Sequence, residues 1–371
     1  MKLSERLRDA RSGINLTGVQ VRELTGIGES SLSEFENGKR EPSLSQLQVL
    51  ASLYKRSLSF FLSEEPVLQE TVLWRKRPSE DAESIEASFL RLCEQYHNLE
   101  TWCGEEVKPC LPELCVADRE YDMDEARNLA KRVRNDLQLG DRPAHVLLRV
   151  LEEYCGTKVF CMEFQPSGTA ASVCSQVTGC SVLLNANNVR WRRNFDLAHE
   201  LFHLLTWSHF RKQENPGCQV TSNNEEKLAD CFASNLLMPR EAVEGVVSRR
   251  RHDGRLVYED IFDIAREFDV SVDALMWRLH DIYRRKGDEN RTRAEIKKLK
   301  SLSPMVEERA RENTKAPERP ERYRALAIKA LRRGEISTGR FAEYLGISRC
   351  QAMEYVGQEY TAGEEITFTS A

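Results

Sequence analysis

Two histidines lie four residues apart in the stretch NFDLAHELFHLLTW, residues 194–207, and a glutamate directly follows the first of them. His199, Glu200 and His203 fit the pattern H-E-x-x-H. Residues four apart share one face of a helix, so both imidazoles can reach one metal ion at about 2.0–2.1 Å. Glu200 lies beside that face, where it can take a proton from a water molecule on the metal. The alternative is an ordinary buried helix, because seven histidines give such a match by chance in on the order of one chain in a hundred.

The other positions of this stretch favour the metal site over the alternative. They are mostly apolar, which predicts a buried helix: Phe195, Leu197, Ala198, Leu201, Phe202, Leu204 and Leu205. Two unpaired histidines and a glutamate would be costly in such a helix, and coordination of a cation would offset that cost.

A catalytic zinc ion usually has three protein ligands and one open position, so a third ligand must follow. The segment NNEEKLADCFASNLLMP predicts a helix in which Glu226 and Asp230 lie one turn apart. Glu226 can supply the third ligand, and Asp230 can accept the outer N–H of a ligating histidine. Glu225 competes with Glu226, because the register could differ by one residue. The alternative for this segment is a surface acidic turn at a helix N-terminus.

Composition bounds the class of protein. The chain has 371 residues, of which 40% are hydrophobic and 30% charged, and a formal net charge of -5. These values predict a soluble, multidomain protein with no membrane span and, without a signal peptide, a cytoplasmic location. The eleven cysteines are scattered, so we expect free thiols in a reducing compartment. The negative charge implies that any DNA contact comes from a local patch.

Four regions are expected along the chain, and together they predict a multidomain, mainly α fold with one α+β domain. Residues 1–63 should form an all-α helix-turn-helix unit around the turn TGIG. Residues 64–118 should be an extended strap and an amphipathic connector helix. Residues 119–285 contain helices and two expected strands, TKVFCMEF and CSVLLNAN, with the turn-prone PSGTA between them. Residues 286–371 should be a solvated, charged linker and a small helical module, whose turn LGIS has the pattern of a second helix-turn-helix.

The stretches VLLNANNVRWRRNFDLAHELFHLLTW and EEKLADCFASNLLMP resemble the ImmA/IrrE family of metallopeptidases, and the match spans roughly residues 120–283. The resemblance implies a zincin-like fold and a zinc-dependent peptidase whose targets are repressor proteins. It makes His199, His203 and Glu226 ligands and Glu200 the general base. Zinc follows from the ligand types, and Mn²⁺ or Fe²⁺ suits the same set.

Two positions depart from that family's pattern. Phe202 stands where the family usually has glycine, which is expected to narrow the cleft. Trp207 stands where many members have histidine, and His209 follows two residues later. His209 could polarise a substrate carbonyl, but an exposed position without a catalytic role is the expected alternative.

Residues 3–62 resemble the Xre/Cro-type helix-turn-helix family, most clearly in SEFENGKREPS. In such folds the second helix of the motif enters the major groove, which would place Glu29 and three serines at base edges. The expected DNA contacts are Ser30, Ser31 and Ser33, with Lys39 and Arg40 near phosphates. Glu29 and Glu34 would repel phosphates, Gly18 replaces a common glutamine, and Arg22 replaces a small residue. Residues 1–56 hold nine Lys or Arg against seven Asp or Glu, so a protein-docking unit stays an alternative to a DNA reader.

The leading hypothesis is a zinc-dependent endopeptidase fused to a regulatory helix-turn-helix. It would cleave a repressor or another regulatory protein and so switch on a stress, phage or mobile-element response. The main alternative is a DNA-binding transcription regulator whose metal domain senses a ligand or partner without proteolysis. A toxin–antitoxin or defence component is a third hypothesis. The expected partners are a protein substrate and operator DNA, with a homodimer as the expected assembly.

Overall fold

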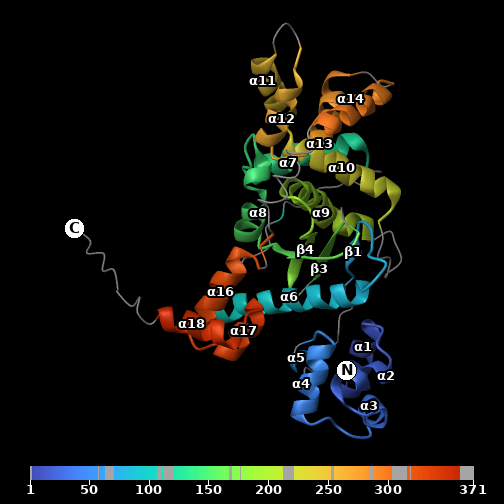
Figure 1. The fold of residues 1–371 in the computed structure, drawn as a ribbon, viewed down its shortest axis with the longest axis vertical. Helices are drawn as coiled ribbons and strands as arrows, with labels where there is room; N and C mark the ends of the chain where they lie inside the picture. The colour runs from blue at the N-terminus through green and yellow to red at the C-terminus, as the bar shows by residue number, and fades with distance from the viewer. Residues whose placement is uncertain are drawn as a thin grey trace, which may run out of the picture.

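The computed structural model describes residues 2–56, 58–62, 71–106, 111, 121–166, 169–175, 177–211, 221–251, 255–284, 287–302, 316–317 and 319–359. Within these residues the fold is multidomain and mainly α, with one small mixed sheet, as the sequence predicts (Figure 1). Buried apolar side chains form three clusters: one in the N-terminal unit and one on each face of the sheet.

The N-terminal unit consists of five short helices: α1 (Leu3–Gly13), α2 (Gly18–Thr25), α3 (Glu29–Glu36), α4 (Leu44–Leu53) and α5 (Leu58–Leu62). Gly26 ends α2 in the left-handed region, φ 74°, which glycine adopts without steric cost. Arg11 joins α1 to α3 through a two-pronged pair with Glu36, with N···O distances of 2.6 and 2.8 Å. Glu36 lies in SEFENG, the segment that most clearly resembles the Xre/Cro-type family, so this segment contributes to the packing of the unit.

The sheet has the strand order β1-β3-β4-β2. Its strands are β1 (Leu73–Trp74), β2 (Lys158–Met162), β3 (Ala170–Ser175) and β4 (Gly179–Asn185), and only the β2–β4 pair is parallel. The predicted strands TKVFCMEF and CSVLLNAN are present as β2 and β4. Neither β1 nor β3 was predicted, and β3 begins inside the expected turn PSGTA. Small residues give β3 no strand signal, and β1 is only two residues long.

Successive residues of the strands face two different layers, as the pleat requires. Val159, Val182 and Leu184 face the helices that carry the H-E-x-x-H stretch, whereas Phe160 and Leu183 face the opposite side. The first layer contains α7 (Met123–Asp136), the 3₁₀ turn Pro143–His145, α8 (Leu147–Arg149) with a π-helical turn Val150–Tyr154, α9 (Arg190–Arg211) and α10 (Asn223–Leu237).

Four further helices extend this first layer: α11 (Arg240–Arg250), α12 (Tyr258–Glu267), α13 (Val272–Tyr283) and α14 (Glu289–Leu302). The prediction of a solvated linker is wrong for α14. Ile296 and Leu299 are buried in the core, and Lys300 pairs with Asp273 of α13 at 2.6 Å. The charged residues lie between these apolar positions at helical spacing, so an overall count of charge hides the buried face. Residues 303–315 of the expected linker lie outside the described residues.

The opposite layer is built from α6 (Ala82–Cys103) and the C-terminal helices α16 (Glu321–Arg332), α17 (Thr338–Leu345) and α18 (Arg349–Glu359). The expected connector helix is present as α6. It packs on β2 through Phe89 and Tyr96, which contact Phe160 edge to face. Tyr323 of α16 contacts the rings of Tyr96 and Phe160, so three distant parts of the chain share one core. No described helix is both long and apolar enough to cross a membrane.

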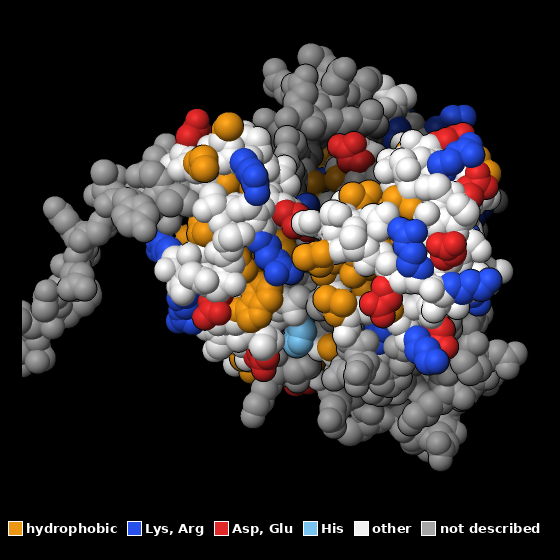
Figure 2. Space-filling view, turned by 90° about the horizontal axis from the view of Figure 1, so that it is seen from below, with side chains coloured by type: hydrophobic (Ala, Val, Ile, Leu, Met, Phe, Trp, Pro, Cys, Tyr) orange, Lys and Arg blue, Asp and Glu red, His pale blue; other side chains and the backbone are white. Residues whose placement is uncertain are grey.

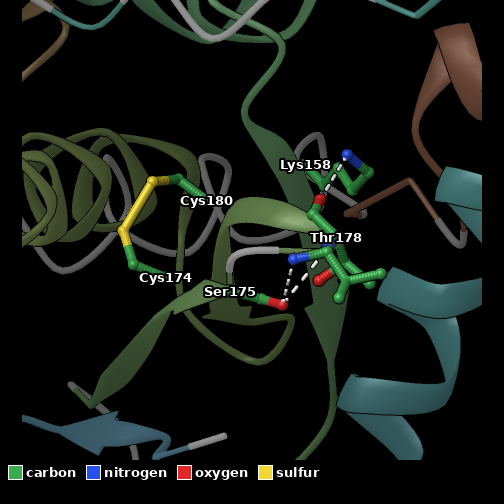
Figure 3. The surroundings of a disulfide bond; sticks show 6 residues. Lys158, Cys174, Ser175, Thr178 and Cys180 are labelled. Atoms are coloured by element: carbon green, nitrogen blue, oxygen red, sulfur yellow. Dashed lines mark hydrogen bonds between the residues drawn. A yellow bond between two sulfur atoms is a disulfide. The ribbon is translucent and has the colours of Figure 1, made fainter. Parts of the chain in front are cut away.

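The expectation of free thiols is wrong for one pair, because Cys174 and Cys180 form a disulfide across the β3–β4 hairpin (Figure 3). Strand pairing sets the two residues opposite each other, with Cα atoms 4.3 Å apart. The Ser175 hydroxyl accepts hydrogen bonds from the backbone of the turn, and Lys158 donates to the carbonyl of Thr178 at 2.7 Å. The hairpin beside α9 is thus fixed at its tip.

We predict that Glu36→Gln loosens the N-terminal unit by about 1–3 kcal/mol, because it weakens a nearly buried, charge-assisted pair with Arg11. Hydrogen exchange of α1 and α3 in the full chain measures the effect as lost protection. The control is Glu29→Gln, whose pair with Arg22 is half exposed on both sides. This variant should cost less than about 1 kcal/mol. Equal loss in both variants would contradict the structural role of Glu36.

Candidate metal centre

Helices α9 and α10 pack against each other and bring the predicted ligands together. Apolar positions on both helices are buried in the same core, including Leu201 and Phe232. Ser222 caps α10, because its hydroxyl accepts the backbone N–H of Glu225 at 3.2 Å. This cap sets where the first turn of α10 begins, and so the direction in which its acidic residues point.

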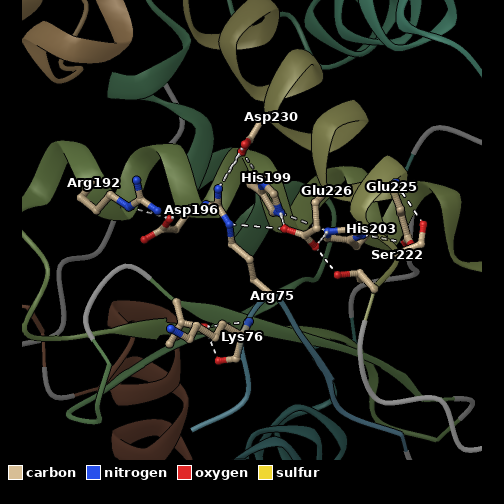
Figure 4. Close-up of polar contacts among 12 residues, drawn as sticks. Arg75, Lys76, Arg192, Asp196, His199, His203, Ser222, Glu225, Glu226 and Asp230 are labelled. Carbon is tan, nitrogen blue, oxygen red and sulfur yellow. Dashed lines mark hydrogen bonds and ion pairs between the residues drawn. The ribbon is translucent and has the colours of Figure 1, made fainter. Parts of the chain in front are cut away.

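His199 and His203 from α9 converge with Glu226 from α10 (Figure 4). The two Nε2 atoms are 3.1 Å apart. One carboxylate oxygen of Glu226 lies 3.2 Å from Nε2 of His199, and the other lies 3.4 Å from Nε2 of His203. Both imidazoles are buried, and Glu226 is partly exposed. The three residues that the sequence groups together therefore do meet in space.

These separations fit a tetrahedral cation. Ligand atoms at about 2.0–2.1 Å from zinc lie roughly 3.3 Å from one another on one face of a tetrahedron. The Nε2 atoms are 3.1 Å apart, and each lies 3.2–3.4 Å from a different oxygen of Glu226, so one donor atom from each residue lies within 4.8 Å of the others. Two imidazole nitrogens and a carboxylate oxygen are also the donor types that zinc prefers, and Mn²⁺ or Fe²⁺ accepts the same donors. The residues present fit a divalent metal ion, with the fourth corner left to a substrate or water.

Each histidine is oriented by a second carboxylate from α10. Nδ1 of His199 lies 2.9 Å from Asp230, and Nδ1 of His203 lies 2.9 Å from Glu225. Glu225 therefore faces the outer nitrogen of His203, whereas Glu226 faces both inner nitrogens. The two alternatives for the third ligand are separated by geometry: Glu226 converges with the imidazoles, and Glu225 acts as an outer partner.

The hydrogen bonds at Nδ1 determine which nitrogen of each imidazole presents a lone pair to the site. Because each Nδ1 donates to a carboxylate, neutral imidazoles would point both Nε2 lone pairs at each other and at Glu226. Burial alone would lower the pKa of His203, but hydrogen bonds with Glu225 and Glu226 outweigh it and raise this pKa to about 9. Burial alone would raise the pKa of Glu226, yet hydrogen bonds with His199 and His203 hold it well below its ordinary value. The site thus attracts positive charge.

Glu200 lies beside the triad and is 1% exposed. Its carboxylate makes no close hydrogen bond to a described residue, although the hydroxyl of Ser172 on β3 stabilises its charged form. Burial raises the pKa of Glu200 above its ordinary value, although the neighbouring His203 and His199 favour the charged form. A buried carboxylate with so little hydrogen bonding is costly, so its position calls for a role in chemistry rather than in packing.

Arg75 also reaches the site and was not predicted. It follows β1, and its guanidinium lies 2.9 Å from Asp230, 3.4 Å from Glu226 and 3.5 Å from Asp196 (Figure 4). Asp196 is buried on α9, where burial raises its pKa, and it also pairs with Arg192 at 3.0 Å. No local sequence signal marks Arg75, because it reaches the site only through the pairing of β1 with β3. The acidic residues that it contacts lie more than a hundred positions later in the chain.

Two predictions about α9 are wrong. Phe202 does not narrow a cleft, because it is fully buried and its ring packs 5.7 Å from that of Phe232 on α10. A larger side chain than glycine is accommodated there by the core between the helices. His209 is half-buried rather than exposed, with ring contacts to Tyr121 and Phe210, and the absence of a catalytic role for it stays a prediction.

The predicted DNA contacts lie on the outer side of α3 and in the turn after it. Ser30, Ser33, Lys39 and Arg40 are exposed, and Ser31 is half-buried. The acidic residues on this helix are partly neutralised. Glu29 pairs with Arg22 at 2.7 Å, and Glu34 lies 3.7 Å from Arg40. Arg22 therefore reaches outward across α2 and α3 and bridges the two helices.

Comparisons with known proteins divide the chain in the same way. Residues 152–280 match a peptidase family model described as the IrrE N-terminal-like domain, and residues 2–59 match a helix-turn-helix domain. The HTH-type transcriptional regulator ImmR of Bacillus subtilis (strain 168) is 27% identical over 143 residues, which cover 38% of this chain and 95% of that protein. The chain therefore carries an N-terminal helix-turn-helix domain and an IrrE-like domain, as the resemblances predict.

We predict that Glu226→Gln removes stoichiometric zinc from the purified protein, because an amide is a poor replacement for a ligating carboxylate. Glu225→Gln keeps all three ligands and should weaken zinc binding about 10–100-fold by loosening His203. Elemental analysis and competition with a chromogenic chelator measure the two effects. Loss of zinc in Glu225→Gln with retention in Glu226→Gln would show that the two roles are reversed.

We predict that Arg75→Met makes the protein more dependent on zinc for stability. Without this guanidinium, the carboxylates of Glu226, Asp230 and Asp196 lose a shared partner, which bound zinc partly replaces. The unfolding midpoint should fall by about 2–4 °C in chelator and by less with zinc. Arg77→Met is the control, because Arg77 pairs with Glu83 and Glu86 instead. Its loss should be equal in both conditions, and equal losses for Arg75→Met would contradict the prediction.

Proposed function

We propose that this chain, which joins a helix-turn-helix domain to an IrrE-like domain of a peptidase family, is a zinc-dependent endopeptidase. Its substrate would be a repressor or another regulatory protein, whose cleavage switches on a stress, phage or mobile-element response. His199, His203 and Glu226 would hold the metal ion, and Glu200 would act as the general base. The family match supports a peptidase domain, and the geometry of the triad supports a divalent metal.

The observation that carries the proposal is the state of Glu200. A site that only held a structural metal would not need a fourth acidic residue beside the ligands. Glu200 is buried, makes no close hydrogen bond to a described residue and has a pKa raised by burial, although the Ser172 hydroxyl favours its charged form. These properties suit a group that takes up and releases a proton during each turnover.

The chain's own residues divide the work of peptide hydrolysis. When bound, the divalent cation supplies Lewis acidity to the scissile carbonyl and to the attacking water. Glu200 accepts a proton from that water and passes it to the leaving amine nitrogen, so the carboxylate is restored at the end. Asp230 and Glu225 hold the two imidazoles in one orientation through Nδ1. Arg75 balances the charge of the surrounding carboxylates and ties β1 to α10.

The helix-turn-helix domain supports a regulatory target rather than a general digestive role. Such domains bind DNA, and the relative from Bacillus subtilis is named as a transcriptional regulator. A peptidase on the same chain would then act close to DNA, where regulatory proteins bind. Ser30, Ser31, Ser33, Lys39 and Arg40 are the residues we propose to contact operator DNA.

The alternative function is a DNA-binding transcription regulator whose metal domain senses a ligand or partner without proteolysis. The name of the relative favours it, because that protein is described as a regulator and this chain covers 95% of its length. The two functions predict different behaviour of Glu200: proteolysis requires its carboxylate, whereas sensing requires only the ligands.

We predict that Glu200→Gln lowers the rate of cleavage by about 10²–10⁴-fold while zinc content stays at the wild-type level. Candidate repressors encoded next to the gene for this chain are incubated with each purified protein, and the products are read by mass spectrometry. Glu244→Gln is the control, since this carboxylate pairs with Arg240 on the surface of α11. Unchanged cleavage in Glu200→Gln would remove Glu200 from the mechanism. Absence of cleavage by the zinc-loaded wild type, with tight operator binding, would favour the alternative.

A further inference from the structure

The C-terminal helices α16, α17 and α18 repeat the architecture of the N-terminal reader. Helices α2 and α17 are both eight residues long and both end at a glycine in the left-handed region, Gly26 with φ 74° and Gly346 with φ 68°. An isoleucine follows each glycine, and the next helix begins two residues later. The turn between the two helices of a helix-turn-helix is therefore built twice in this chain.

The caps and the core of the two units also correspond. Thr17 caps α2, and Ser337 caps α17, in each case by accepting the N–H of the third helical residue. Val21 and Phe341 are fully buried at the same position of the first helix. Leu32 and Ala352 are likewise buried at the same position of the second helix, at 3% and 0% exposed. Matching caps, turns and buried positions indicate the same helix crossing.

The packing of this C-terminal module leaves one face of α18 exposed to solvent. Helix α17 rests on α6, where Tyr344 stacks on Trp102 and Glu343 pairs with Arg91. Of the residues described on α18 with their side chains, only Ala352 is buried. Met353 is 66% exposed. A recognition helix requires such an uncovered face.

The charge of the module suits nucleic acid better than that of the N-terminal unit. Residues 319–355 contain eight Lys or Arg and four Asp or Glu, although the whole chain has a net charge of -5. Arg349 occupies the place that Glu29 holds on α3, and Ala342 occupies the place of Arg22. A basic residue thus replaces an acidic one at the start of the recognition helix, and a small residue stands where the two helices cross.

We propose that α17 and α18 form a second double-stranded DNA interface, separate from the N-terminal reader. Arg349 at the start of α18 contacts the edge of guanine in the major groove, and Met353 one turn later contacts a thymine methyl group. Arg340 lies near the N-terminus of α17, exposed on one side and over the rings of Trp102 and Tyr344 on the other, and its exposed side contacts a phosphate beside the groove. Arginine is the residue type most often used to contact guanine, because its charged guanidinium donates two hydrogen bonds to the edge of that base.

The arrangement of the two readers has a consequence for the DNA site. Figure 1 shows the N-terminal unit below α6 and the C-terminal helices at the left end of α6, and Figure 2 shows Lys and Arg side chains interspersed with Asp and Glu on the face seen from below. Helix-turn-helix proteins usually obtain two readers by forming a dimer. This chain carries two in one copy, so a monomer can recognise a bipartite sequence.

The test uses the full chain and duplexes enriched from a random DNA library by repeated selection on the wild type. Fluorescence anisotropy then gives the affinity for the selected duplex at several salt concentrations. Arg340→Gln with Arg349→Gln should weaken binding about tenfold or more, and it should reduce the salt slope by about one for the lost phosphate contact of Arg340. Lys39→Gln with Arg40→Gln should weaken binding to the other half of the same duplex, which footprinting resolves.

Lys329→Gln is the matched control, because Lys329 belongs to the same module but pairs with Glu105 next to α6. It should leave both affinity and salt slope unchanged. Three results would overturn the proposal: wild-type binding in the Arg340 and Arg349 variant, an equal loss in Lys329→Gln, or selection of no duplex by the wild type. The last result would leave α18 as a docking face for a protein. Circular dichroism of each variant confirms that the module is still folded.

Discussion

Three Lewis bases held a few ångströms apart inside an apolar core are the constraint on which the IrrE-like domain depends. The Nε2 atoms of His199 and His203 face each other at 3.1 Å, and both face the carboxylate of Glu226. Such a group is unfavourable without positive charge at its centre. The surrounding structure serves to hold it: the Ser222 cap orients α10, and carboxylates from α10 fix both imidazoles.

The same constraint links parts of the chain that are distant in sequence. Strand β1 follows the segment that leaves the N-terminal unit, and its pairing with β3 delivers Arg75 to the acidic residues of α9 and α10. The opposite face of the sheet supports α6 and the C-terminal helices. The candidate metal centre and the C-terminal helices therefore lie on opposite faces of one small sheet, and the N-terminal unit lies beyond α6 with its own core (Figure 1).

Local patterns in the sequence predicted a large part of this structure. The features that they missed depend on contacts between residues far apart in the chain. Helical spacing grouped His199 with His203 and placed Glu226 one helix later, because these relations need only a few residues of context. The choice between Glu225 and Glu226 required the capped register of α10, which depends on Ser222. Arg75 had no local signal, and strand β3 is made of small residues. The buried face of α14 was hidden by its high content of charge.

X-ray absorption spectroscopy of the zinc-loaded chain tests the central claim most directly, because it reports the atoms bound to the metal. The structure predicts a first shell of nitrogen and oxygen at about 2.0–2.1 Å, with the outer-shell scattering of two imidazole rings. Zinc bound through sulfur at about 2.3 Å, or with fewer than two imidazoles, would show that the convergence of His199, His203 and Glu226 does not form the metal site.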